Sequence, residues 1–121
     1  IAYIVKKAEI DQSGFVDVLT RLGYEIKSKE LRVRLDGTAK GDWDMGIAID
    51  AVSIAQKLDV VVLVSGDGDF VHLVEMLKAQ GCKVEVVSFE KSTAVELINS
   101  ATDYISINKS WLLKEKKGEG I

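Results

Sequence analysis

The chain has 121 residues, 47% of them hydrophobic, which is enough for one domain with a core of its own. Its 16 basic and 19 acidic residues give a formal net charge of −3, so no overall positive field attracts it to nucleic acid. A nuclease that binds a metal cation stays compatible with this balance, because the cation supplies positive charge locally.

The single cysteine, Cys82, excludes an intramolecular disulfide framework and indicates the cytosol. We expect it to be a small core residue. No apolar run approaches the roughly 18 residues of a transmembrane helix. The expectation is therefore a cytoplasmic protein with no membrane partner.

The first predicted elements are a strand, a helix and a second strand. The strand at residues 1–5 begins without an initiating methionine, so we expect a fragment or a chain whose beginning has been removed. The helix at residues 11–22 has one inner apolar stripe, formed by Phe15, Val18, Leu19 and Leu22. Residues 24–35 alternate apolar and charged side chains, which indicates an edge strand. The cations of this strand form either a solvated edge or a track for a phosphate backbone: Lys27, Lys29, Arg32 and Arg34.

A helix is predicted from about residue 43 to residue 58, with Asp42 as its N-cap. Its inner stripe is expected to comprise Ile47, Ala51, Ile54 and Leu58. Asp44 lies on the same face, one turn earlier. A carboxylate on a buried stripe is costly unless something pairs with it, so Asp44 is a candidate ligand. Asp50 points about 120° away around the helix and ranks below Asp44.

The central stretch, residues 60–70, reads Val-Val-Val-Leu-Val-Ser-Gly-Asp-Gly-Asp-Phe. Five consecutive apolar residues, four of them valine, predict a strand that is buried on both faces of a parallel sheet. Asp67 and Asp69 follow at its carboxyl end, where open α/β sheets bind ligands. One of the two can simply cap the next helix. Two crowded carboxylates, however, repel each other unless they share a proton or a cation.

The rest of the chain continues the alternation of strand and helix. A helix at residues 70–80 is followed by a strand at 83–89, a helix that Ser92 opens, and a last strand at 104–107. This order predicts right-handed crossovers and a three-layer α/β/α sandwich with a mainly parallel, Rossmann-like sheet. We expect one domain at residues 1–113 and a charged, flexible tail at residues 114–121.

Asp44, Asp67 and Asp69 all come at helix or loop starts on the expected carboxyl edge of this sheet. No histidine or cysteine accompanies them, so the set is wrong for zinc and suits Mg²⁺ or Mn²⁺. Such an ion can activate water and hold a phosphodiester for in-line attack.

Four blocks of the sequence resemble the NYN domain, in its LabA-like branch of the PIN-like nuclease group. They are Lys-Gly-Asp-Trp-Asp at residues 40–44, Ser-Gly-Asp-Gly-Asp-Phe at 65–70, Val-Glu-Val-Val-Ser at 84–88, and residues 97–105. The resemblance covers about residues 1–107. It implies a PIN-like fold and a metal-dependent ribonuclease that acts on single-stranded RNA.

The resemblance also implies roles for individual residues. Asp44, Asp67 and Asp69 would be the catalytic acids that bind Mg²⁺ or Mn²⁺, and Lys40 and Ser65 would orient phosphate or water. Asp103, in the Ala-Thr-Asp that precedes the last strand, is either a capping residue or an acid that contacts the metal ligands and not the metal itself. It stands with Asp50 in the second rank.

One departure from the family pattern affects these expectations. NYN domains begin with a central strand that ends in an Asp, and this chain has no such stretch. We therefore expect the first central strand and one catalytic Asp to be missing, so that the fragment binds metal poorly and cleaves slowly or not at all. The gap would leave backbone groups unpaired unless it closes or another chain fills it, for example in a homodimer through the exposed gap.

Two other readings are kept beside the nuclease. A phosphatase of the haloacid dehalogenase type also has a Gly-Asp-Gly motif after a buried strand, but no strand here ends in the Asp-x-Asp-x-Thr nucleophile of that class. A PIN-like domain without catalysis could instead bind RNA or protein partners. Retention of all three acids argues against that module.

Overall fold

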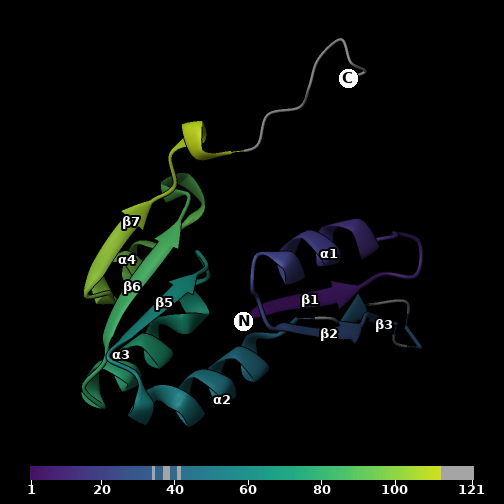
Figure 1. Ribbon diagram of the computed structural model, residues 1–121. Coiled ribbons are helices and arrows are strands. Elements are labelled where there is room, and N and C mark those ends of the chain that lie inside the picture. Colours follow the sequence, from purple (N-terminus) through teal and green to yellow (C-terminus); the bar gives the residue numbers. More distant parts are fainter. Residues whose placement is uncertain (34, 37–38, 41, 113–121) are drawn as a thin grey trace. The chain divides into compact units, whose positions relative to one another are not determined.

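The computed structural model describes residues 1–33, 35–36, 39–40 and 42–112. The chain divides into two compact units, Ile1–Ile49 and Asp50–Ile121, and each is described by itself (Figure 1). The predicted tail at residues 114–121 and Arg34 lie outside the described residues. No described helix is both long enough and apolar enough to cross a membrane.

The first unit contains a two-stranded parallel sheet and a short antiparallel ribbon. In the parallel sheet, Ala2 of β1 is opposite Ile26 of β2. The ribbon consists of β3 and β4. The helix α1 connects the two parallel strands, as the alternating pattern predicted. The elements of this unit are β1 (Ala2–Lys6), α1 (Ser13–Arg21), β2 (Ile26–Glu30), β3 (Arg32–Val33), β4 (Ala39–Lys40) and the start of α2 (Asp44–Ile54).

The second predicted strand, at residues 24–35, is divided into β2 and β3 in the structure. The Leu31 amide still donates a hydrogen bond to the Lys6 carbonyl oxygen at the end of β1, at 2.9 Å. Because β1 ends at that residue, the following segment has no parallel partner there and pairs with β4 instead.

The predicted inner stripe of α1 is wrong for three of its four residues. The side chains of Phe15, Val18 and Leu22 are 59%, 50% and 69% exposed, and no residue of α1 is fully buried. Val16 and Leu19 are half-buried instead. A two-stranded sheet is too narrow to cover the full width of an amphipathic helix, so part of the apolar stripe stays open.

Local interactions order both ends of α1. The Ser13 amide donates to the Asp11 carboxylate at 2.9 Å, and this backbone hydrogen bond holds the pKa of the Asp11 carboxyl below its usual range. Gly23 follows the helix with a φ of +96°, a left-handed conformation that favours glycine.

The second unit is built on a three-stranded parallel sheet in the order β5-β6-β7. In register, Leu63 of β5, Val86 of β6 and Tyr104 of β7 lie side by side. Parallel strands alternating with helices confirm the predicted α/β class. The elements are η1 (Ala55–Lys57), β5 (Val60–Val64), η2 (Gly68–Phe70), α3 (Val71–Ala79), β6 (Lys83–Ser88), η3 (Glu90–Ser92), α4 (Val95–Ser100), β7 (Asp103–Ser106) and η4 (Lys109–Trp111), the η elements being 3₁₀ turns.

The core of the second unit lies between this sheet and the helices α3 and α4, which cover one of its faces (Figure 1). Phe70 of η2 and Leu73, Val74 and Leu77 of α3 are all buried, and Cys82 is buried as expected. Apolar burial of this kind is the main stabilising contribution to such a layer. The buried residues are Leu63, Phe70, Leu73, Val74, Leu77, Cys82, Val84, Val86 and Leu97, with Ala55 from the preceding turn.

The prediction that β5 is buried on both faces is wrong for one face. Leu63 is 8% exposed on the face that α3 and α4 cover, whereas Val60, Val62 and Val64 are 43%, 55% and 69% exposed on the other. β5 also pairs on one side only, with β6, among the described residues. The composition of β5 is typical of a strand that is covered on both faces. In this unit, however, β5 is an edge strand with one open face.

The predicted inner stripe of α2 also needs correction at its end. Ile54 and Leu58 are 44% and 38% exposed, whereas Ala55 is only 1% exposed. The chain changes from α to 3₁₀ winding at Ala55. At this change of winding the small Ala55 side chain, and not that of Ile54, reaches the core.

Candidate metal centre

The acidic loop, residues 65–69, connects the carboxyl end of β5 with η2 and α3. The Ser65 hydroxyl oxygen accepts a hydrogen bond from the Asp67 amide at 3.1 Å. The Asp67 carboxylate accepts one from the Asp69 amide at 2.9 Å and thereby caps η2, which is the capping role that aspartate commonly has. The loop is therefore ordered by its own side chains.

The Asp67 and Asp69 carboxylates remain available to a ligand. Both side chains are exposed. One oxygen of Asp67 is used for the cap, while the other and both oxygens of Asp69 accept no hydrogen bond from the described residues. Carboxylate oxygens with open lone pairs next to each other favour a hard divalent cation.

Asp44 begins α2 in the first unit. Its amide donates to the Asp42 carboxylate at 3.3 Å, so Asp42 stabilises the start of the helix. The N-cap position itself belongs to Trp43, whose carbonyl oxygen accepts the first helical hydrogen bond from the Ile47 amide at 2.7 Å, so the predicted N-cap is one residue too early. The Asp44 side chain is half-buried in the first turn.

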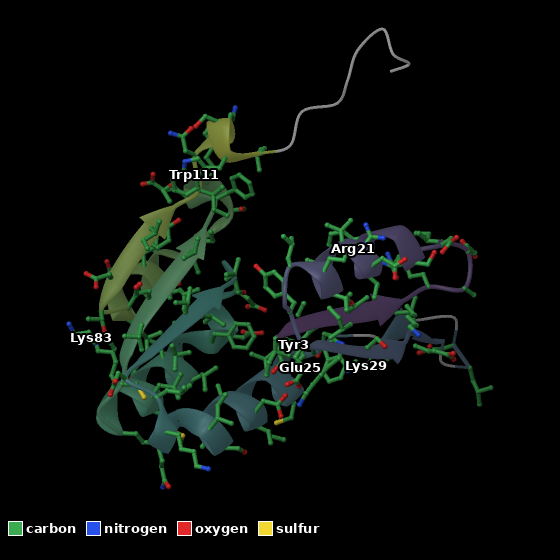
Figure 2. All side chains as sticks on the ribbon, in the orientation of Figure 1. Tyr3, Arg21, Glu25, Lys29, Lys83 and Trp111 are labelled. Carbon is green, nitrogen blue, oxygen red and sulfur yellow. The ribbon has the colours of Figure 1, made fainter. Side chains whose placement is uncertain are left out.

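Trp43 fixes the start of α2 on the sheet of the first unit. Its indole nitrogen donates to the Ile4 carbonyl oxygen at 3.0 Å, and its ring centroid lies 5.2 Å from that of Tyr3. The Lys29 ammonium lies 4.7 Å from the Trp43 ring centroid. Tyr3 and Lys29 come from the neighbouring strands β1 and β2 (Figure 2).

The indole of Trp43 also requires glycine one turn further along α2. A Cβ added at Gly46 would lie 2.6 Å from a carbon of the Trp43 ring. The ring is thus enclosed between Gly46, Tyr3 and Lys29, and packing accounts for its placement.

The other residues that the sequence analysis named as candidates lie as follows in the structure. The Lys40 and Arg32 side chains lie outside the described part of the structure. Asp50 is half-buried in α2. Asp103 is exposed at the amino end of β7, opposite Glu85 of β6. By register, Asp103 is level with the middle of β5 and not with its carboxyl end.

A group of hydroxyls behind the acidic loop was not predicted. Ser88 at the end of β6, Tyr104 near the start of β7 and Thr93 hydrogen-bond to one another. Only the Ser at the end of the strand at 84–88 pointed toward it in the sequence. The prediction that Ser92 opens a helix is wrong, because α4 begins at Val95 and Ser92 ends η3.

The donor chemistry of the acids fits Mg²⁺ or Mn²⁺. Each of the three predicted ligands, Asp44 in the first unit and Asp67 and Asp69 in the second, can offer carboxylate oxygens. An oxygen-only set without histidine or cysteine matches these hard cations and does not match zinc. Asp44 belongs to the first unit and the other two to the second, and their convergence on one ion is part of the proposed function.

Comparison with known proteins places the chain in a family. The sequence pattern of the NYN domain matches residues 1–108. The low amplitude and bright protein LabA of Synechococcus elongatus is 35% identical over 117 residues, which cover 90% of this chain. The chain spans 63% of the length of that relative.

A solved structure gives the same result for the fold. The crystal structure of a protein of unknown function from Vibrio parahaemolyticus is 41% identical and has a TM-score of 0.84. The match covers 93% of this chain and 70% of that protein. The fold is the PIN-like α/β class expected from the sequence, and the chain belongs to the NYN domain family.

Proposed function

We propose that this chain is the core of a metal-dependent ribonuclease that hydrolyses phosphodiester bonds in single-stranded RNA. Asp44, Asp67 and Asp69 hold one Mg²⁺ or Mn²⁺ ion through carboxylate oxygens. When bound, such an ion activates water and stabilises the charge that develops on the phosphate.

The observation that carries this proposal is the state of the acidic loop. The loop holds two exposed carboxylates in place through the hydrogen bonds at Ser65 and Asp67, and it leaves three of their four oxygens without a hydrogen bond from the described residues. Preorganised acceptors of one charge at the carboxyl end of a parallel strand favour a cation and, through it, an anionic substrate.

Other side chains are assigned to the substrate. Lys40 and Ser65 orient the phosphate or the attacking water, and the Ser65 hydroxyl can still donate its proton while its oxygen accepts from Asp67. Lys29 lies beside the start of α2 and offers a positive charge to the RNA backbone. Asp50 and Asp103 keep the second rank, and register puts Asp103 away from the end of β5.

The whole protein is proposed to act in the cytoplasm. A second copy is the proposed partner of the open sheet edges, since β1 and β5 each pair on one side only among the described residues.

Metal binding and RNA cleavage test the proposal together. Asp67→Asn removes the charge of the capping acid but keeps an oxygen that can accept from the Asp69 amide. We expect it to lower Mn²⁺ affinity by about 100-fold and to abolish Mn²⁺-dependent cleavage of an end-labelled single-stranded RNA by the full-length protein. Mn²⁺ titration followed by electron paramagnetic resonance and gel analysis of the RNA give the two readouts.

Asp59→Asn is the matched control. Asp59 is exposed and lies just before β5, at the opposite end of the strand from the acidic loop, so the charge change is the same and the site is left intact. Equal effects of both substitutions would contradict the proposed site. RNA binding without cleavage would indicate a binding module, and phosphate release from a small phosphoester would indicate a phosphatase.

A further inference from the structure

The acidic loop lies against residues 92–94, the segment that leads into α4. The Ala94 amide donates to the Gly66 carbonyl oxygen at 3.1 Å. A Cβ added at Gly66 would lie 2.7 Å from the Ser92 carbonyl oxygen and 3.1 Å from the Thr93 hydroxyl oxygen. The backbone approaches so closely here that only glycine fits at position 66.

Thr93, at the centre of this contact, is itself held firmly. Its side chain is 9% exposed. Its hydroxyl donates to the Phe89 carbonyl oxygen and lies within hydrogen-bonding distance of the Ser88 hydroxyl and, at 3.4 Å, of the Tyr104 hydroxyl. Two strand ends and a 3₁₀ turn therefore fix the position of one threonine.

The protons of the three hydroxyls can all be placed. Thr93 donates to the Phe89 carbonyl oxygen, and Tyr104 donates to the Ser88 carbonyl oxygen at 3.0 Å. The Ser88 hydroxyl is left to donate to the oxygen of Thr93 or, at 3.2 Å, of Tyr104. Since every donor has an acceptor, this buried network is satisfied and rigid.

We propose that Thr93 is a positioning residue for the acidic loop. The hydroxyl network of Ser88 and Tyr104 fixes Thr93, and Thr93 in turn supports Gly66 and thereby sets where Asp67 presents its carboxylate. The inference rests on the proposed function only in treating Asp67 and Asp69 as metal ligands. The support of the loop is a property of the fold and can be measured without metal.

Amide hydrogen exchange of the ¹⁵N-labelled chain tests this support directly. Thr93→Val keeps the shape of the side chain but removes the hydroxyl, so the Phe89 carbonyl oxygen loses one of its donors and the Ser88 hydroxyl loses the Thr93 oxygen and keeps the Tyr104 oxygen alone. We expect the Ala94 and Asp69 amides, whose acceptors lie in the acidic loop, to exchange about tenfold faster. Thr93→Ser keeps the hydroxyl and is expected to restore slow exchange.

Ser100→Ala separates support of the loop from general loss of stability. The Ser100 hydroxyl donates to the Leu97 carbonyl oxygen at 2.8 Å in the last turn of α4, so its loss weakens the same helix at the other end from the loop. We expect no selective change in the loop amides. Unchanged exchange in Thr93→Val, or equal acceleration in Ser100→Ala, would overturn the inference.

A Mn²⁺ titration of the same substitutions in the full-length protein connects the inference to the site. We expect Thr93→Val to lower Mn²⁺ affinity about tenfold and Thr93→Ser to keep it within about twofold. If the unaltered full-length protein bound no Mn²⁺ while the exchange results held, the proposed function would fail and the support of the loop would stand. Faster exchange with full Mn²⁺ affinity would overturn the positioning role.

Discussion

At the scale of single residues, the glycines of the acidic loop do more than allow a turn. Gly66 lies under the segment at residues 92–94, and a Cβ added at Gly68 would lie 2.9 Å from the Ala94 Cβ. Gly66 therefore allows the two segments to touch through their backbones, and Gly68 leaves room for the Ala94 side chain. The acids between and beside them are placed by this contact as much as by their own hydrogen bonds.

Gly66→Ala is predicted to disturb the acidic loop. The added methyl group would collide with the Ser92 carbonyl oxygen, so the loop must shift, at a cost of about 1–3 kcal/mol in the free energy of unfolding. Gly14→Ala is the control, because a Cβ there meets nothing within 4 Å, and alanine in the helix α1 is expected to be neutral or stabilising. Urea denaturation measures both variants, and equal stability of the two would contradict the predicted contact.

Part of the site was predictable at this scale and part was not. A cap by one of Asp67 and Asp69 and the hydrogen bond between the Asp42 carboxylate and the start of α2 follow from local rules, since each involves an amide two residues away. The network of Ser88, Thr93 and Tyr104 joins residues up to 16 positions apart. Such contacts depend on register between strands, which no local pattern specifies.

At the scale of elements, α2 shows how the start of a helix that carries a proposed ligand is fixed. Trp43 ties the first turn to β1 through its hydrogen bond to Ile4 and its packing on Tyr3. Asp44 follows it directly. The orientation of that carboxylate within the first unit therefore depends on the indole.

Trp43→Phe is predicted to weaken the first unit. Phenylalanine keeps an aromatic ring but loses the N–H that donates to the Ile4 carbonyl oxygen, at an expected cost of about 1–2 kcal/mol in the free energy of unfolding. Trp111→Phe provides the matched control, since Trp111 is 60% exposed. Urea denaturation followed by circular dichroism compares them. Equal midpoints for the two variants would show that the hydrogen bond contributes nothing.

The type of each element, helix or strand, was predicted well, but the burial of its side chains was predicted less well. Hydrophobic spacing correctly predicted the helix α3, in which Leu73, Val74 and Leu77 are buried. The same reasoning failed for α1, where Phe15, Val18 and Leu22 share a face that remains exposed. Periodicity states which side chains lie together on a helix, but burial also needs a partner surface of sufficient width.

At the scale of the whole molecule, the alternation of strand and helix gave the parallel α/β class, and the comparisons agree with it. It did not give the pairing of each strand. β5 has the composition of an enclosed strand yet pairs only with β6 among the described residues, and Val60, Val62 and Val64 are open on one face. The composition of a strand indicates whether its faces are buried. Whether the strand lies at the edge of a sheet depends on which other strands pair with it.

The central claim is that Asp44, Asp67 and Asp69 share one divalent ion. X-ray diffraction from crystals grown with Mn²⁺, recorded at a wavelength where manganese scatters anomalously, tests it most directly. The account predicts one strong anomalous peak coordinated by carboxylate oxygens of all three residues, and its loss in Asp67→Asn. An ion bound elsewhere, or one held by Asp67 and Asp69 while Asp44 faces away, would contradict it.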